Sequence, residues 1–247
     1  MKSAIPKAAD VKLADNQRLP PFETADLREN LVRFLDTPFK VPGGAPMKVG
    51  NFRWGVYAFY DYDGEPIYVG QTNEMLRTRI RRHLTNQRTD AVAMSVLDPF
   101  EVFEIEVWPL PQFQAQTGGN AAAKDHLNAL ERVVTAKAVA DSVFKAILNE
   151  KDPPPGATTV KPPPSFRGRI ISDRVNELRS HPDFRIARRA LIISRLTQVI
   201  AERKVQGGLR RVLVTQAKRI EWLASRRYEA LGGAASVAKE GQDEDDS

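Results

Sequence analysis

The sequence predicts an α/β fold in which a small antiparallel three-stranded sheet is flanked by helices and followed by a basic C-terminal helical region. An aromatic and β-branched hairpin pattern at residues 51–70 predicts two of the strands. Alternating apolar and acidic side chains at residues 103–107 predict the third strand. Residues 166–232 contain 16 Lys or Arg and 6 Asp or Glu, and this excess of 16 − 6 = +10 defines the basic region.

Local patterns place the elements in order along the chain. We expect a helix at 24–35, strands at 51–60 and 67–70 joined by Asp63-Gly64, a helix over Leu76, Ile80 and Leu84, a strand at 100–108, a helix from Ala121, and helices at 166–178, 184–202 and 209–231. Apolar residues recur every three or four positions in the helical segments. Asn73 is expected to cap the helix that follows the hairpin.

Composition divides the chain into five segments. We expect an N-terminal arm with one amphipathic helix at 1–50, a central α/β domain at 51–152, a proline-rich linker at 153–165, a basic helical region at 166–233 and an acidic disordered tail at 234–247. Two runs of three prolines mark the linker. The arm is expected to pack on the central domain.

Bulk properties exclude several classes of protein. The 247 residues are 42% hydrophobic, which is enough for one or two folded domains. The chain contains no Cys, so disulfide frameworks and thiolate metal sites are excluded. Residues 1–6 lack the apolar core of a signal peptide, and no stretch approaches the roughly 20 apolar residues of a membrane span. We therefore expect a cytoplasmic protein whose net charge of +6 favours a polyanionic partner.

Two tripeptides, a helical Arg-x-x-x-His and two downstream polar residues resemble the signature of the GIY-YIG nuclease family. The residues that carry the resemblance are Gly55-Val56-Tyr57, Tyr68-Val69-Gly70, Arg79, His83, Glu131 and Asn149. The tyrosines are 68 − 57 = 11 positions apart, and the Arg and His are 83 − 79 = 4 apart. Val replaces Ile in both tripeptides, and the spacing of 149 − 131 = 18 is looser than the family pattern.

The resemblance implies that residues 51–152 form a metal-dependent endonuclease domain that hydrolyses phosphodiester bonds in DNA. It implies Mg²⁺ as the cofactor, with Mn²⁺ able to substitute, and a restriction-type enzyme is the favoured subtype. In this interpretation Tyr57 orients or deprotonates the attacking water, and Tyr68 offers its hydroxyl to the phosphate. Arg79 balances the growing charge, and His83 is a proton partner. A phenol with a pKa near 10 is a poor base, so Tyr57 would need a nearby cation in order to deprotonate the attacking water.

Each of these residues also has a structural interpretation. The tyrosines fit a strand core, and His83 fits an ordinary hydrogen-bonded histidine. Glu131 lies within an apolar helical stripe, where an unpaired carboxylate is costly, so it predicts either a metal ion or an internal ion pair with Arg. Asn149 is expected to order the site or to hold a phosphate, and the alternative is a helix C-terminal cap.

Six basic residues are candidate DNA contacts, and solvated surface charge is their alternative interpretation. They are Arg77, Arg82, Arg210, Arg211, Lys218 and Arg219. The C-terminal helices that carry four of them are expected to bind DNA or to form a homodimer, unless they wrap the central domain. Cutting both strands with one site per subunit would require such a dimer or sequential nicks. Two other functions stay open: a nucleic-acid-binding protein without catalysis on the same scaffold, and a repair or mobile-element nuclease acting on branched DNA or RNA.

Overall fold

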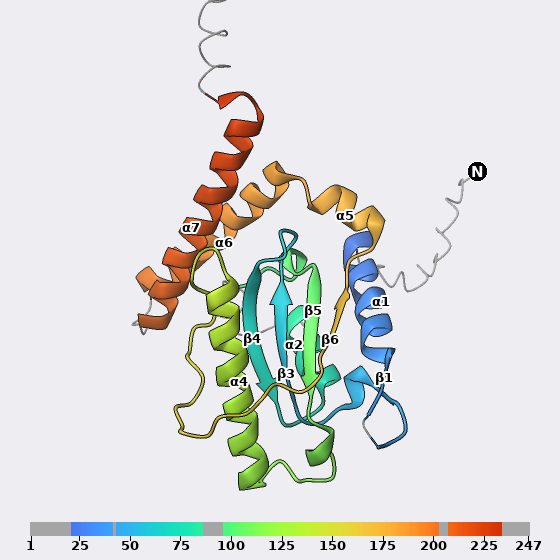
Figure 1. The fold of residues 1–247 in the computed structure, drawn as a ribbon. Helices are drawn as coiled ribbons and strands as arrows, with labels where there is room; N and C mark the ends of the chain where they lie inside the picture. The colour runs from blue at the N-terminus through green and yellow to red at the C-terminus, as the bar shows by residue number, and fades with distance from the viewer. Residues whose placement is uncertain (1–20, 42, 86–95, 203–206, 234–247) are drawn as a thin grey trace, which may run out of the picture.

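The fold is a central sheet covered on both faces by helices, as seen in a computed structural model that describes residues 21–41, 43–85, 96–202 and 207–233. The first 20 residues of the expected arm and the expected acidic tail from residue 234 lie outside these ranges. Figure 1 shows helix α4 (Ala121–Asp141) in front of the sheet and helix α2 (Leu76–Leu84) behind it. At the upper end of the sheet lie helices α5 (Asp173–Arg179), α6 (Pro182–Glu202) and α7 (Gly207–Ala230). In the described ranges no helix combines the length and apolarity that a bilayer crossing demands.

Four antiparallel strands form the main sheet in the order β4-β3-β5-β6, so the expected three-stranded sheet is wrong by one strand. The strands are β3 (Gly55–Tyr60), β4 (Pro66–Thr72), β5 (Glu104–Pro109) and β6 (Phe166–Arg169). A separate pair, β1 (Pro38–Phe39) and β2 (Met47–Lys48), lies in the N-terminal part. Since β4 is an outer strand, one of its edges is open to segments other than β3.

Strand β6 replaces the beginning of the helix expected at 166–178. It pairs with β5, and the Arg167 guanidinium lies 2.6 Å from the Glu104 carboxylate across the two strands. Gly168 allows helix α1 to approach, because a Cβ at this position would lie 3.1 Å from the Phe34 ring. The strand has only four residues, and its stabilising partners are more than 50 positions away in the chain. Local periodicity therefore does not reveal it.

A β-bulge interrupts the regular pairing of β3 and β4 next to Tyr60. The register shifts between Phe59 and Tyr60, so that Tyr68 pairs with Phe59 while Pro66 pairs with Tyr60. Ile67, the extra residue, is buried on the same side as Tyr68. Both signature tyrosines face α2 rather than α4, because the regular part of the register places Tyr68 opposite Phe59, on the same face as Tyr57.

The helices follow the predicted apolar patterns closely. They are α1 (Phe22–Asp36), α2 (Leu76–Leu84), α4 (Ala121–Asp141), α5 (Asp173–Arg179), α6 (Pro182–Glu202) and α7 (Gly207–Ala230), with short 3-10 turns at Val49–Asn51, Pro99–Glu101 and Pro111–Phe113. Residues of α1, α2, α6 and α7 share one buried cluster with Tyr57 and Phe59, whereas α4 packs on the opposite face against Val56 and Val69. Asn73 does not cap α2: its amide donates to the Gly118 carbonyl at 3.2 Å.

A buried charge cluster attaches α6 and α7 to the end of the sheet. Asp61, after β3, accepts hydrogen bonds from Arg219 at 2.8 Å and from Arg189 at 3.1 Å. Glu101 pairs with Arg189 at 3.0 Å, and Arg185 pairs with Asp63 at 2.6 Å. Part of the charge that the sequence assigns to a basic surface is therefore internal.

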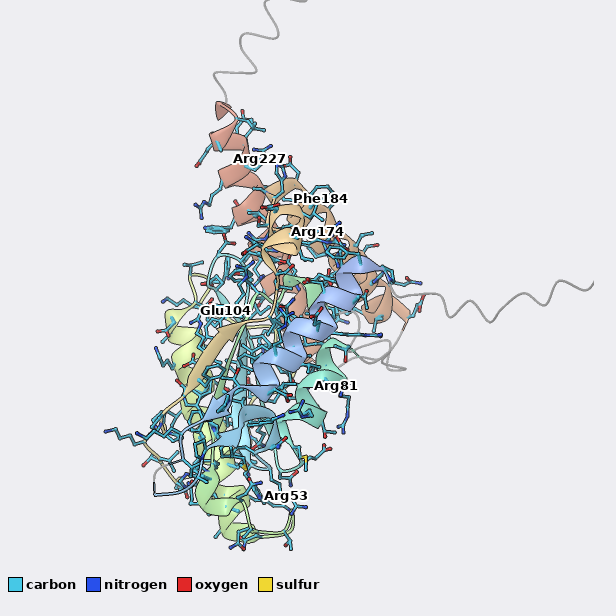
Figure 2. The ribbon with its side chains drawn as sticks, turned by 90° about the vertical axis from the view of Figure 1, so that its right-hand side faces the viewer. Arg53, Arg81, Glu104, Arg174, Phe184 and Arg227 are labelled. Carbon is cyan, nitrogen blue, oxygen red and sulfur yellow. The ribbon has the colours of Figure 1, made fainter. Side chains whose placement is uncertain are left out.

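The expectation that Arg219 contacts DNA is corrected by this cluster. Its side chain is only 3% exposed, and burial lowers its pKa while the Asp61 carboxylate opposes that effect. A guanidinium held this way cannot reach a phosphate without breaking a buried ion pair. Figure 2, turned by 90° from Figure 1, shows Arg227 and Phe184 at the end of the molecule where α6 and α7 lie, remote from Arg53.

Candidate active site

A cavity of about 470 Å³ opens along the outer edge of β4, between α2 and α4. Five of the six residues with an expected catalytic or metal-binding role line it, and they come from four separate segments of the chain. These are Tyr68, Arg79, His83, Glu131 and Asn149. The fold thus brings together, at one sheet edge, residues that are up to 81 positions apart in the sequence, since 149 − 68 = 81.

Tyr57 is the exception, because it is fully buried beneath the cavity and does not line it. Its β4 partner is Gly70, which does line the cavity. A Cβ at Gly70 would lie 2.5 Å from the Tyr57 hydroxyl oxygen, closer than real atoms approach. Glycine at this position therefore leaves room for the Tyr57 hydroxyl.

The ionisation of Tyr57 argues for an orienting role. Burial raises the pKa of its phenol well above 10, and the nearby Tyr68 adds to this, while Arg79 opposes it more weakly. No described group meets the Tyr57 hydroxyl at ordinary hydrogen-bonding geometry, although Arg79 is near enough to favour the phenolate. The Tyr57 phenol is therefore neutral, and its hydroxyl is a hydrogen-bond donor rather than a base.

Arg79 and His83 stand one helical turn apart on α2 and both face the tyrosines. The His83 ring centroid lies 5.3 Å from that of Tyr68 and 5.8 Å from that of Tyr57. Arg79 is half-buried, and its Nε is buried without a hydrogen bond from the described residues. Neighbouring phenol groups raise the pKa of Arg79 against the effect of burial, so the guanidinium keeps its charge at the cavity.

Glu131 projects from α4 on the other side of β4. Its helical neighbours Leu127, Leu130 and Val134 are buried, as the apolar stripe predicted. Burial raises the pKa of Glu131 to about 7, and Arg79 counteracts this only in part. In the described part of the chain no ion pair or hydrogen bond involves the Glu131 carboxylate, so the alternative of an internal Arg pair is not observed.

The donor set around Glu131 fits one hydrated Mg²⁺ ion. The described ranges contain no group of three or more His, Asp or Glu side chains that could together bind a metal ion. Mg²⁺ is commonly held by one or two carboxylates together with water and substrate phosphate, which matches a lone carboxylate in an open cavity. Glu131 would hold the ion, which when bound would supply positive charge to the reacting phosphate.

Asn149 is not a helix cap, and its side-chain amide pairs with the backbone of β4. Helix α4 ends at Asp141 and is followed by Ser142 as its C-terminal cap. The Asn149 Nδ2 group donates to the Val69 carbonyl at 2.7 Å, and the Val69 N–H donates to Asn149 Oδ1 at 3.0 Å. The preceding Leu148 N–H donates to the Ile67 carbonyl at 2.8 Å. Asn149 therefore closes the open edge of β4 and holds the cavity wall in place.

The rest of that wall comes from residues that the sequence did not single out. Lys151, Asp152, Pro153 and Pro154 all line the cavity, so the proline-rich segment forms part of the site. Arg132, next to Glu131, anchors this segment by donating to the Pro154 and Thr158 carbonyls, each at 2.8 Å. No local signal in the sequence indicates that a proline segment folds back across α4.

The remaining candidate DNA contacts divide by their partners. Arg77 joins α2 to α1 through Asp36, and Arg82 forms a two-point pair with Glu74 at 2.9 and 3.1 Å. Arg211 lies 2.9 Å from Asp152 and donates to the carbonyls of Asn149 and Glu150, so it supports the cavity wall. Arg210 and Lys218 are exposed, and no described residue pairs with either of them.

Comparison with known protein families agrees with this arrangement. The model of the GIY-YIG catalytic domain matches residues 53–116, which run from just before β3 to just before α4. Glu131 and Asn149 lie beyond the matched residues. No curated protein and no solved structure matched the chain. Residues 53–116, which contain the two tyrosines and the Arg-His pair, are therefore similar to the catalytic domain of the GIY-YIG nucleases.

Proposed function

We propose that this protein is a metal-dependent endonuclease that hydrolyses phosphodiester bonds in DNA. The observation that carries the proposal is the cavity at β4, which unites a cationic Arg79, the His83 ring, the Tyr68 phenol and a carboxylate, Glu131, that has no protein partner among the described residues. Hydrolysis of a phosphodiester needs an oriented water, a proton acceptor and positive charge near the phosphate. The cavity supplies a group for each of these needs.

Each side chain has a defined task in the proposed reaction. The Tyr57 hydroxyl, held in the floor by Gly70, orients the attacking water together with Tyr68. His83 takes a proton from this water as its oxygen forms a bond to phosphorus. The P–O3′ bond breaks, and the leaving O3′ oxygen takes a proton from solvent water, so that the products are a 5′-phosphate and a 3′-hydroxyl. Arg79 donates to the phosphate oxygens as their negative charge grows.

The first test is cleavage of plasmid DNA by the full chain with Mg²⁺, with Mn²⁺ and with a chelator. Nicked or linear DNA should form with either metal ion and not with the chelator. Glu131→Gln should lower the cleavage rate by at least about 10²-fold while DNA binding changes little, because it removes a charge needed in the transition state. Equal cleavage by wild type and Glu131→Gln would refute the proposal.

Restriction-type cleavage at a specific sequence is the subtype that we propose, with a homodimer as the arrangement that would cut both strands. Sequencing the ends produced from genomic DNA tests it: a single repeated end sequence supports a restriction-type enzyme. Ends scattered over the genome, or cleavage confined to branched DNA or RNA, would contradict it. Sedimentation of the chain with and without DNA measures the oligomeric state.

A further inference from the structure

A second hollow adjoins the cavity and continues it along the same edge of the sheet. It has a volume of about 370 Å³ and shares Gln71 and Arg79 with the first. Thr72, Asn73 and Glu74 follow Gln71 along the chain, and the opposite wall is the beginning of α4, which contributes Lys124, Leu127 and Asn128. The two hollows meet at Gln71 and Arg79, and together they are called the channel below.

The groups that line this hollow are mostly hydrogen-bond donors and cations. Lys124 is exposed, and no described residue pairs with its ammonium group. Asn128 is fixed by Gln71, whose Nε2 donates to Asn128 Oδ1 at 2.9 Å, so the Asn128 NH₂ group remains available as a donor. Arg79 lies at the junction and reaches both hollows.

The one carboxylate of the hollow is already neutralised. Glu74 forms a two-point pair with Arg82, at 2.9 and 3.1 Å, which leaves Lys124 and Arg79 as a surplus of positive charge. Lys124 lies in the first turns of α4, where the positive end of the helix dipole also favours an anion. The hollow is therefore complementary to a phosphate group.

We infer that this hollow binds a phosphodiester of the substrate strand next to the one that is cut, with Lys124 and Asn128 as positioning residues. The inference rests on the proposed function, since it concerns how DNA lies in that site. Lys124 would neutralise the flanking phosphate and Asn128 would donate to one of its oxygens. The substrate strand would then follow the channel past Arg79 to Glu131.

The test is DNA binding as a function of salt, measured for the full chain carrying Glu131→Gln so that no DNA is cut. Each phosphate contact that is lost lowers the slope of log K against log salt by about 0.9. Adding Lys124→Gln should therefore reduce the slope by about 0.9 and weaken binding about eightfold at about 0.1 M salt. Asn128→Ala should weaken binding several-fold without changing the slope, because the amide carries no charge.

Lys137→Gln is the matched control, because Lys137 lies on the same helix but pairs with Asp141 at 2.5 Å and lines a different hollow. It should leave both slope and affinity unchanged. A methylphosphonate that removes the charge of a single flanking phosphate should cost the Glu131→Gln protein about the same eightfold. The same methylphosphonate should cost nothing further once Lys124→Gln is present.

An unchanged slope for Lys124→Gln, or an equal loss for Lys137→Gln, would overturn the inference. Cleavage by the wild-type chain reports separately on the proposed function. If the wild type cuts DNA while Lys124→Gln binds normally, only the flanking site is refuted. If the slope falls as expected but the wild type cuts nothing, the phosphate site stands and the catalytic proposal fails.

Discussion

Replacing Glu131 by Gln should make the metal-free protein more stable at pH 8, although it should abolish cleavage. Burial raises the pKa of this carboxyl from 4.5 to about 7, so its ionised form is unfavourable in the folded chain. The gap of 7 − 4.5 = 2.5 pH units corresponds to about 3 kcal/mol, at about 1.4 kcal/mol for each unit. Gln has nearly the same shape and carries no charge to desolvate.

The sign of the pH dependence follows from proton binding. Because the folded state holds the Glu131 proton up to a higher pH than the unfolded chain does, ionisation favours the unfolded chain as the pH rises from 4.5 to 7. The wild type therefore loses stability relative to the variant across this window, and the difference is complete above pH 7. Between pH 5 and pH 8 the advantage of Glu131→Gln should grow by about 2.5 kcal/mol.

Urea denaturation in a chelator, at pH 5 and at pH 8, measures this difference as a change in the free energy of unfolding. Asp141→Asn is a suitable control, since Asp141 is an exposed carboxylate on the same helix. Mg²⁺ at a hundred times its Kd should nearly cancel this difference at pH 8, because it adds about 2.7 kcal/mol to the wild type and nothing to the variant. A variant that is no more stable than wild type at pH 8 would refute the account of Glu131 as a desolvated, unpaired carboxylate.

Three further substitutions test the scaffold. Asp61→Asn should lower the free energy of unfolding by about 3–5 kcal/mol, because buried guanidinium groups lose their charged partner, and urea denaturation measures this loss. The control Asp173→Asn, at the surface, should cost less than about 0.5 kcal/mol. Gly70→Ala should lower both stability, by about 1–3 kcal/mol, and cleavage rate, since its Cβ meets the Tyr57 hydroxyl; normal values of both would contradict this. Arg211→Ala should lower kcat several-fold, because the loss of the pair with Asp152 loosens the cavity wall. Arg210→Ala should instead weaken DNA binding and leave kcat unchanged. An unchanged kcat for Arg211→Ala would show that the wall does not contribute to catalysis.

The hairpin and its signature could be predicted because their information is local. Alternating β-formers around Asp63-Gly64 specify two paired strands, and once the strands pair, Tyr57 and Tyr68 must lie near each other. The four-residue repeat of α2 likewise places Arg79 and His83 one turn apart on a single face. These predictions needed only the periods of a strand and of a helix.

The basic region shows where local information fails. Sequence counting treats Arg210, Lys218 and Arg219 alike, yet Arg219 is buried and the other two are exposed. The difference is Asp61, which lies 158 positions before Arg219 in the chain and forms the ion pair that makes the burial of Arg219 energetically possible. A pattern within α7 alone does not contain that partner.

The signature residues, the helical faces and the position of Glu131 in an apolar stripe could all be predicted, because residue type and short spacing set them. Three other features are visible only in the folded chain: β6 completes the sheet, Asn149 closes the edge of β4, and the proline-rich segment forms a wall of the cavity. Each of these features is a contact between segments distant in the chain. Such contacts form where unpaired backbone groups of a strand edge, or buried charges, find partners in distant segments, and local sequence periodicity does not predict them.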